Sequence, residues 1–279
     1  GPGLSLKSEA LGLAVMTELP LVVVDVQRGG PSTGLPTKTE QSDLAQALYG
    51  RNGECPVVVM TSSSPSDCFH YAFEAGRIAM EHMTPVILLS DGFIANGSEP
   101  WRIPSMKDYP KICPPIVETA PEGGFMPYVR NEKMVRGWAF PGKVGLEHRV
   151  GGLEKDAVKG SISIDPDNHQ KMVKTRAAKV ALVAEDIPVQ QVWGDEEGDL
   201  LVVGWGGTRG HLQNAVEEMR REGHRVSLCH FNYINPLPHG VADIFKRFKK
   251  IIVCELNRGQ FASYLRGQFQ EFEYEQYNK

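Results

Sequence analysis

The sequence predicts an α/β protein with parallel β-sheets. Short apolar runs typical of buried parallel strands alternate with helical patterns in two parts of the chain. The runs span residues 20–26, 56–60 and 85–90 in the first part and 199–205, 225–230 and 251–255 in the second. Between them, from 99 to about 177, repeated prolines interrupt every periodic pattern. We therefore predict three segments, namely residues 1–98, a proline-rich connecting segment 99–193, and a second α/β domain 194–279.

Composition narrows the classes of function. A chain of 279 residues with 41% apolar residues is long enough to bury a core, and its net charge of -4 favours no nucleic acid partner. We expect no membrane partner and a cytoplasmic location, because no apolar run approaches the roughly 20 residues that span a bilayer and no signal-peptide pattern is present. The five cysteines are odd in number and lack a C-x-x-C pair, so no metal or iron–sulfur site is predicted. The basic cluster 246–250 is interpreted as a solvated helix end.

The chain opens on a predicted loop followed by a helix. Gly1, Pro2 and Gly3 are expected to stay outside a helix, whereas residues 4–18 have apolar residues at helical spacing. The strand at 21–26 follows. A helix that leads into such a strand normally follows an earlier strand of the same sheet, so we expect an N-terminally truncated domain.

The first segment continues as a right-handed βαβ series. We predict a helix over 39–49 that Gly50 ends, and then the strand at 56–60. The next helix runs through His82, with Ser64 as its N-cap and Pro65 at its first position.

The second half contains four predicted helices. Asp167 or Asn168 caps a helix that includes 172–180, and the others span 211–222, about 240–249, and a stretch from Gln260. The glycine-rich turn at 206–210 looks like a nucleotide loop. It lacks the dinucleotide fingerprint and an acidic residue after the second strand.

The loop 28–44 is the candidate site. It follows a strand at its carboxyl end, where ligands bind in open parallel sheets, so Arg28 stands where a small anion would be held. Glycines at 29, 30 and 34 let the backbone approach a ligand. The alternative is that Arg28 is an ordinary surface arginine.

Four stretches carry a resemblance to a known family, and they are 28–44, 49–54, 63–69 and 255–260. Together they are similar to the α subunits of 2-oxoglutarate:ferredoxin oxidoreductases, which are thiamine diphosphate enzymes of the 2-oxoacid:acceptor oxidoreductase family. The resemblance covers most of the chain. It implies a parallel-sheet, thiamine diphosphate pyrimidine-type domain followed by a transketolase C-terminal-like α/β domain.

The resemblance also implies site residues. Arg28 would bind the substrate carboxylate, Thr37 would lie by the same pocket, and Gly1, Pro2 and Gly3 would lie beside the cofactor. No catalytic residue is expected in this chain, since the family's activating glutamate precedes the Gly-Pro-Gly turn. The stretch 91–96 is interpreted as a polar strand-to-helix turn and not as a diphosphate motif.

The implied reaction is oxidative decarboxylation of a 2-oxoacid to an acyl-CoA, with coenzyme A as co-substrate and ferredoxin as electron acceptor. Thiamine diphosphate and magnesium would be held mainly by a partner β subunit, which would also carry an iron–sulfur cluster. This chain alone should therefore be inactive. Two alternatives stay open: a pyruvate or branched-chain 2-oxoacid enzyme, and a non-catalytic nucleotide-binding module built on 204–210. The stretch 31–37 favours 2-oxoglutarate.

Overall fold

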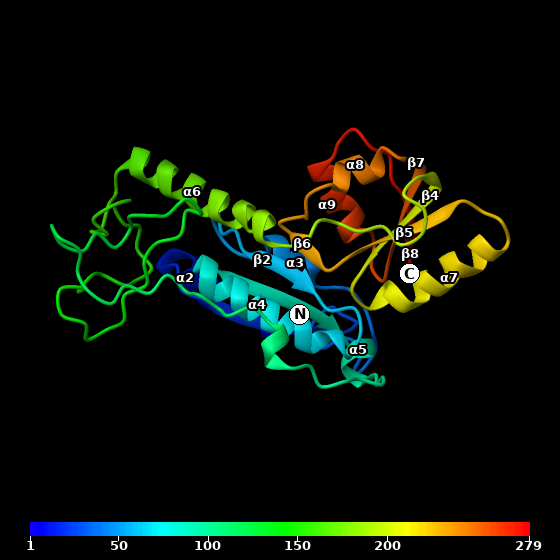
Figure 1. Cartoon of the computed structure of the whole chain (residues 1–279), viewed down its shortest axis with the longest axis horizontal. Coiled ribbons are helices and arrows are strands. Elements are labelled where there is room, and N and C mark those ends of the chain that lie inside the picture. Colours follow the sequence, from blue (N-terminus) through cyan, green and yellow to red (C-terminus); the bar gives the residue numbers. More distant parts are fainter.

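Two four-stranded sheets form the framework of the computed structural model, which describes all residues from 1 to 279 (Figure 1). The first sheet has the order β1-β3-β2-β6. Its strands are β1 (Leu21–Gln27), β2 (Val58–Thr61), β3 (Pro85–Asp91) and β6 (Tyr233–Asn235). The first three strands are parallel, with Val86 of β3 opposite Val22 and Val58, whereas β6 runs antiparallel to β2.

Helices of the first part surround this sheet. They are α1 (Pro2–Ser5), α2 (Ser8–Thr17), α3 (Leu44–Tyr49), α4 (Asp67–His82) and α5 (Gly92–Asn96). The longest, α4, presents Ala75 and Ile78 to Met60, Val86 and Leu88 of the sheet, and all five side chains are buried. Burial of apolar side chains at this spacing is what holds a helix to a sheet face.

The second sheet is fully parallel, with the order β5-β4-β7-β8. Its elements are β4 (Gly198–Trp205), the 3-10 turn η3 (Gly206–Thr208), α7 (Arg209–Arg221), β5 (Val226–Phe231), α8 (Val241–Phe245), β7 (Phe248–Glu255), α9 (Gln260–Gln268) and β8 (Glu275–Asn278). The predicted parallel-sheet α/β fold class is confirmed, since six predicted strands form within a few residues of their expected positions.

Residues 97–165 form a long irregular connection that starts beside α5 and then makes the green loops at the left of Figure 1. This connection contains the short 3-10 turn η1 (Met106–Asp108). The helix α6 (Pro166–Ala181) and the 3-10 helix η2 (Leu182–Asp186) follow it. No helix of the chain combines the length and apolarity needed to cross a bilayer.

The two sheets share one hydrophobic core. Its 26 buried residues include Val59 and Leu89 of the first sheet together with Val203 and Phe231 of the second. The strand β6 belongs in sequence to the predicted segment 194–279, yet it pairs with β2 of the first sheet. The packing therefore joins the two parts closely, and the division at 98 and 193 stays a prediction.

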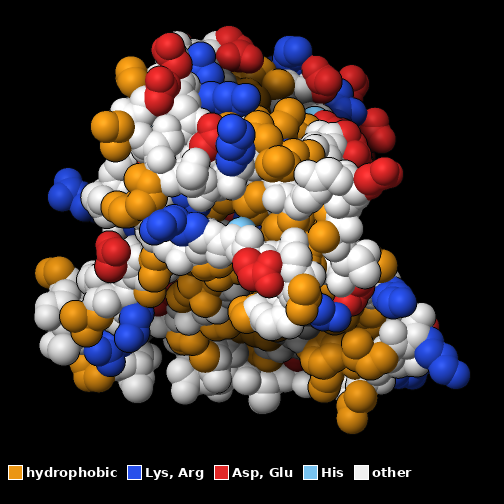
Figure 2. Space-filling view, turned by 90° about the vertical axis from the view of Figure 1, so that its left-hand side faces the viewer, with side chains coloured by type: hydrophobic (Ala, Val, Ile, Leu, Met, Phe, Trp, Pro, Cys, Tyr) orange, Lys and Arg blue, Asp and Glu red, His pale blue; other side chains and the backbone are white.

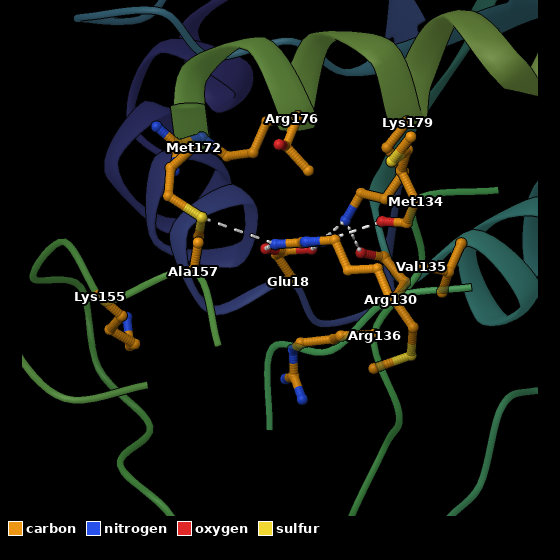
Figure 3. Close-up of polar contacts among 12 residues, drawn as sticks. Glu18, Arg130, Met134, Val135, Arg136, Lys155, Ala157, Met172, Arg176 and Lys179 are labelled. Carbon is orange, nitrogen blue, oxygen red and sulfur yellow. Dashed lines mark hydrogen bonds and ion pairs between the residues drawn. The ribbon is translucent and has the colours of Figure 1, made fainter. Parts of the chain in front are cut away.

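A buried cluster of charges ties the irregular connection to the first part (Figure 3). Glu18, at the end of α2, is 1% exposed and accepts hydrogen bonds from Arg130 at 2.7 and 2.5 Å and from Lys179 of α6 at 2.6 Å. Burial alone would raise the pKa of Glu18, but the charges and hydrogen bonds of Lys179 and Arg130 lower it to about 2. Nearby, Arg136 donates to the carbonyl oxygen of Thr17 at 2.8 Å. One carboxylate thus joins three segments that are distant in sequence.

Several helix starts differ from the predictions. Helix α1 begins at Pro2, so the expectation that residues 1–3 stay outside a helix is wrong, because proline is tolerated in a first turn. The helix predicted over 39–49 begins only at Leu44. Helix α4 begins at Asp67 with Ser66 in the N-cap position, so the predictions of Ser64 as N-cap and Pro65 as first helical residue are wrong. Helix α6 is capped by Asp165, not by Asp167 or Asn168, since the Asp165 side chain accepts from the Asn168 N–H.

Two further predictions fail in the second part. The helix expected over 240–249 ends at Phe245, and the basic cluster 246–250 spans the start of β7. There the buried side chain of Phe248 packs inward, while Lys249 and Lys250 are exposed. The short strand β8 was not predicted, because its exposed sequence has no apolar run. By contrast, the interpretation of 91–96 as a polar turn is confirmed, since Asp91 caps α5.

Candidate functional site

A cleft of about 1030 Å³ opens beside the carboxyl end of β1. It is lined by Gly1, Pro2, Ser5, Leu6, Arg28, Gly30, Pro31, Ser32, Glu40, Ser42, Asp43, Gln46, Asn257, Arg258, Gln260, Asn278 and Lys279. The cleft therefore combines the N-terminal turn, the loop after β1 and the turn between β7 and α9. Most of its lining residues have polar or charged side chains, which suits a small charged ligand.

The loop after β1 closes on itself by backbone contacts. Gly29 donates to the carbonyl oxygen of Lys38 at 2.9 Å, and Leu35 donates to that of Gly29 at 2.9 Å. A side chain at Gly34 is impossible, because its Cβ would lie 1.8 Å from the Gly29 oxygen and φ is +45°. The loop therefore has a defined backbone conformation.

The turn after β7 holds the far end of this loop. Gln41, fully buried, donates from its backbone to Leu256 at 2.9 Å and accepts from the Leu256 N–H through its side chain at 3.0 Å. Asn257 donates to the Gln41 carbonyl at 2.8 Å, and the Gln41 amide donates to Trp205 at 2.7 Å. The second part of the chain therefore positions the loop of the first.

A second chain of contacts reaches Arg28 itself. Gln260 donates to the carbonyl oxygen of Ser42 at 3.0 Å, and the Ser42 hydroxyl donates to the carbonyl oxygen of Arg28 at 2.9 Å. The backbone of Arg28 is thereby fixed, whereas its guanidinium group is exposed and makes no hydrogen bond or ion pair within the chain. A fixed backbone with a free planar cation is the arrangement that binds a carboxylate in two places.

Two carboxyl groups lie behind the N-terminal turn. The Gly1 nitrogen is 2.6 Å from Asp43 Oδ2 and 3.7 Å from Asp25 Oδ1. Burial and the neighbouring Asp43 charge raise the pKa of Asp25 to about 6. The Oδ2 atom of Asp25 is buried and has no hydrogen-bond partner. Buried polar atoms are normally paired, so this one marks a place where a ligand donor would be stabilised.

The structure brings together three of the five predicted site residues. Gly1, Pro2 and Arg28 line the cleft, whereas Gly3 and Thr37 do not. Thr37 is exposed, and its backbone faces Gly92 at the end of β3. The roles of all five stay predictions.

Sequence reasoning missed Asn257, Arg258 and Gln260 as lining residues. The signal was available, since the stretch 255–260 carries part of the family resemblance. The sequence did not predict a role for this stretch, because more than 200 residues separate it from the loop that it contacts.

The glycine-rich turn after β4 packs against the first sheet. A Cβ on Gly206 would lie 2.9 Å from the Gln41 amide, and one on Gly207 would lie 2.3 Å from Asp91 Oδ2. Both glycines and Thr208 are buried. The glycines therefore permit close contact between the two parts of the chain, and the turn offers no open cradle for a phosphate.

Comparisons with known proteins identify the family of the chain. Residues 1–164 match the family model described as "Pyruvate flavodoxin/ferredoxin oxidoreductase, thiamine diP-bdg". The chain is 54% identical over 273 residues to the 2-oxoglutarate oxidoreductase subunit KorA of Mycobacterium tuberculosis, covering 96% of this chain and 41% of that protein. It is 35% identical over 262 residues to the 2-oxoglutarate synthase subunit KorA of Methanothermobacter marburgensis, covering 93% of this chain and 68% of the relative.

A solved structure is similar over the whole chain. The 2-oxoglutarate:ferredoxin oxidoreductase from Magnetococcus marinus, solved with 2-oxoglutarate, coenzyme A and succinyl-CoA bound, superimposes with a TM-score of 0.90 at 34% identity. The match covers 100% of this chain and 48% of that one, so the chain spans about half the length of this relative. On the family model, the sequence identities and this superposition, the chain belongs to the pyruvate flavodoxin/ferredoxin oxidoreductase family, in its thiamine diphosphate-binding part.

Proposed function

We propose that this chain is the part of a 2-oxoglutarate:ferredoxin oxidoreductase α subunit that binds the carboxylate of the 2-oxoacid. The observation that carries the proposal is the free guanidinium group of Arg28 in a polar cleft, on a backbone that Ser42 and Gln260 hold in place. The similarity to KorA subunits supports the choice of 2-oxoglutarate over pyruvate or a branched-chain 2-oxoacid.

The proposed reaction converts a 2-oxoacid, coenzyme A and oxidised ferredoxin into an acyl-CoA, carbon dioxide and reduced ferredoxin. When bound, thiamine diphosphate supplies the nucleophilic carbon and the electron sink for loss of carbon dioxide. Arg28 binds the substrate carboxylate through two charge-assisted hydrogen bonds, and its planar fork orients the neighbouring carbonyl carbon. A fixed orientation of this kind lowers the entropic part of the barrier.

The residues present fit one end of the cofactor. Gly1 and Pro2 line the cleft next to the unpaired Oδ2 atom of Asp25, which would accept a hydrogen bond from an amino group. No three His, Cys, Asp or Glu side chains of the chain come together as a possible metal site. We propose that a partner β subunit supplies the diphosphate and magnesium site and the iron–sulfur cluster, with coenzyme A as co-substrate.

The irregular connection offers a surface for such a partner. Figure 2 looks onto this end of the molecule and shows apolar side chains spread between charged ones. Val144 and Ile164 are 91% and 97% exposed, and Val129, Val150 and Leu153 are also exposed. Exposed apolar residues gathered on one segment are typical of interaction surfaces. We therefore propose that residues 99–193 bind the β subunit.

The test of this function is Arg28→Lys in the assembled enzyme. Lysine keeps the charge but loses the planar fork, and a charge-assisted hydrogen bond is worth about 1.5–3 kcal/mol. We expect kcat/KM for 2-oxoglutarate to fall by about tenfold to a hundredfold. Melting temperature should not change, because the side chain is exposed on a loop.

The matched control is Arg221→Lys, since Arg221 is exposed on α7, forms only a surface pair with Glu217 at 3.6 Å and lies outside both the cleft and the segment 99–193. It should leave kcat/KM unchanged. If Arg28→Lys behaves like this control in a well-folded complex, Arg28 is an ordinary surface residue and the proposed site is wrong.

A further inference from the structure

We propose that Arg258 binds the distal carboxylate of the 2-oxoacid and makes the cleft selective for dicarboxylic substrates. The inference rests on the proposed function, in which Arg28 binds the carboxylate next to the carbonyl carbon. It assigns the second charge of 2-oxoglutarate to the turn between β7 and α9.

The first observation is the distribution of unpaired arginines. Four arginines make neither a side-chain hydrogen bond nor an ion pair nor a contact over an aromatic ring, namely Arg28, Arg102, Arg149 and Arg258. Two of these four, Arg28 and Arg258, line the same cleft. Guanidinium groups near carboxylates usually pair with them, so two free ones in one cleft indicate an external anion.

The acidic side chains of the cleft leave both arginines free. Glu40 accepts from the Gly30 N–H at 2.8 Å, and Asp43 is buried. Neither forms an ion pair with Arg28 or Arg258. Both positive charges therefore stay available, and they match the two negative charges of a dicarboxylate.

The backbone of Arg258 is held on both sides. Asn257 is buried and donates to the carbonyl oxygen of Gln41 at 2.8 Å. Gly259 has φ of +87°, and a Cβ there would lie 2.2 Å from Gln276 Oε1, so only glycine fits. Between these two fixed residues, the exposed side chain of Arg258 extends into the cleft.

The two arginines are also linked to each other through the protein. Gln260, two residues after Arg258, donates to the carbonyl oxygen of Ser42, whose hydroxyl donates to that of Arg28. The distance between the two backbones is therefore set by hydrogen bonds. Fixed backbones limit how far apart the two guanidinium groups can lie, so the pair favours ligands whose two negative charges fall within that span.

A phosphate group of coenzyme A is the other anion that this chemistry would hold. The two possible ligands are distinguished by the kinetic constant that changes when Arg258 is replaced. If Arg258 binds the distal carboxylate, its loss acts on 2-oxoglutarate but not on monocarboxylic 2-oxoacids. If it binds a phosphate, its loss raises the KM of coenzyme A with every 2-oxoacid.

The experiment compares Arg258→Gln with Arg221→Gln in the assembled enzyme, using 2-oxoglutarate and 2-oxobutanoate as substrates; Arg221 is exposed on α7 and lies outside the cleft. We expect Arg258→Gln to lower kcat/KM for 2-oxoglutarate by about tenfold to a hundredfold and to leave that for 2-oxobutanoate and the KM of coenzyme A unchanged. Calorimetry with glutarate, an unreactive dicarboxylate, should show the same loss of affinity. Arg221→Gln should change none of these values.

Three outcomes would overturn the inference: an equal loss for both 2-oxoacids, a loss confined to coenzyme A, or unchanged constants throughout. Failure of the proposed function would look different. In that case the parent enzyme would turn over neither 2-oxoacid, and Arg28→Lys would have no effect on any substrate.

Discussion

Replacing Glu18 with glutamine should destabilise the protein strongly, because Glu18 is the sole carboxylate paired with two buried cations. Lys179 and Arg130 are 3% and 9% exposed in their side chains and both bind Glu18. Removing one partner of a buried ion pair costs about 3–5 kcal/mol, since the other partner stays buried without compensation. At about 2–4 °C per kcal/mol, the melting temperature should fall by roughly 6–20 °C.

The pH dependence gives an independent measure of the same contact. The pKa of Glu18 is lowered from 4.5 to about 2 in the folded protein, so its contribution is present above pH 4.5 and is lost as the pH falls toward 2. At 1.36 kcal/mol per pH unit, this difference amounts to about 3 kcal/mol. The Glu18→Gln variant should lack this acid-dependent loss.

The variant should instead show a pH dependence of stability at high pH. Burial lowers the pKa of Lys179, and without Glu18 the neighbouring Arg130 and Arg136 lower it further. An unfolded lysine then binds a proton that the folded one does not, so stability of the variant should rise with pH up to the ordinary lysine pKa.

Urea denaturation, followed by tryptophan fluorescence across this pH range, measures both effects. The matched control is Glu118→Gln, because Glu118 pairs with Lys143 at 2.7 Å but both side chains are exposed. Such a surface pair is worth about 0–1 kcal/mol. Equal losses of stability in the two variants would refute the assignment of Glu18 as a structural tie.

Two further predictions concern the contacts between the parts of the chain. Gly207→Ala should lower the melting temperature, because its Cβ would lie 2.3 Å from the buried Asp91 carboxylate. Gly210→Ala is the control and should not lower it, because the space around Gly210 is open. An increase in the melting temperature of the parent protein on adding ATP would instead favour a nucleotide site at this turn. Asn257→Ala removes hydrogen bonds to Gln41, Gly259 and Gln260 and should cost about 1–3 kcal/mol of stability and also reduce kcat/KM for the 2-oxoacid. Asn214→Ala, an exposed position on α7, is the control, and equal kcat/KM in the two variants would contradict a role of Asn257 in holding the loop.

The role of the glycine-rich turn depends on which residues lie next to it in the folded protein. In the sequence, residues 204–210 are compatible with a phosphate-binding loop. In the structure, Gly206 and Gly207 contact Gln41 and Asp91, which precede them by more than 100 residues. Glycine is required in both cases because another group approaches the backbone closely. Only the fold reveals that this group belongs to the protein.

Sequence alone determined six of the eight strands, because a run such as 85–90 is apolar on both faces and has no stable place except inside a covered parallel sheet. It also determined Arg28 as a candidate, because a strand end and a glycine-rich loop are local features.

Tertiary structure alone decided which residues surround Arg28. Asn257, Arg258 and Gln260 reach the cleft because β7 ends beside the loop after β1, and Gln41 joins the two by hydrogen bonds. The buried contacts of Glu18 with Arg130 and Lys179 are of the same kind. Charges in separate segments carry no sign of each other in the sequence, because their attraction depends on distance and burial, and folding sets both.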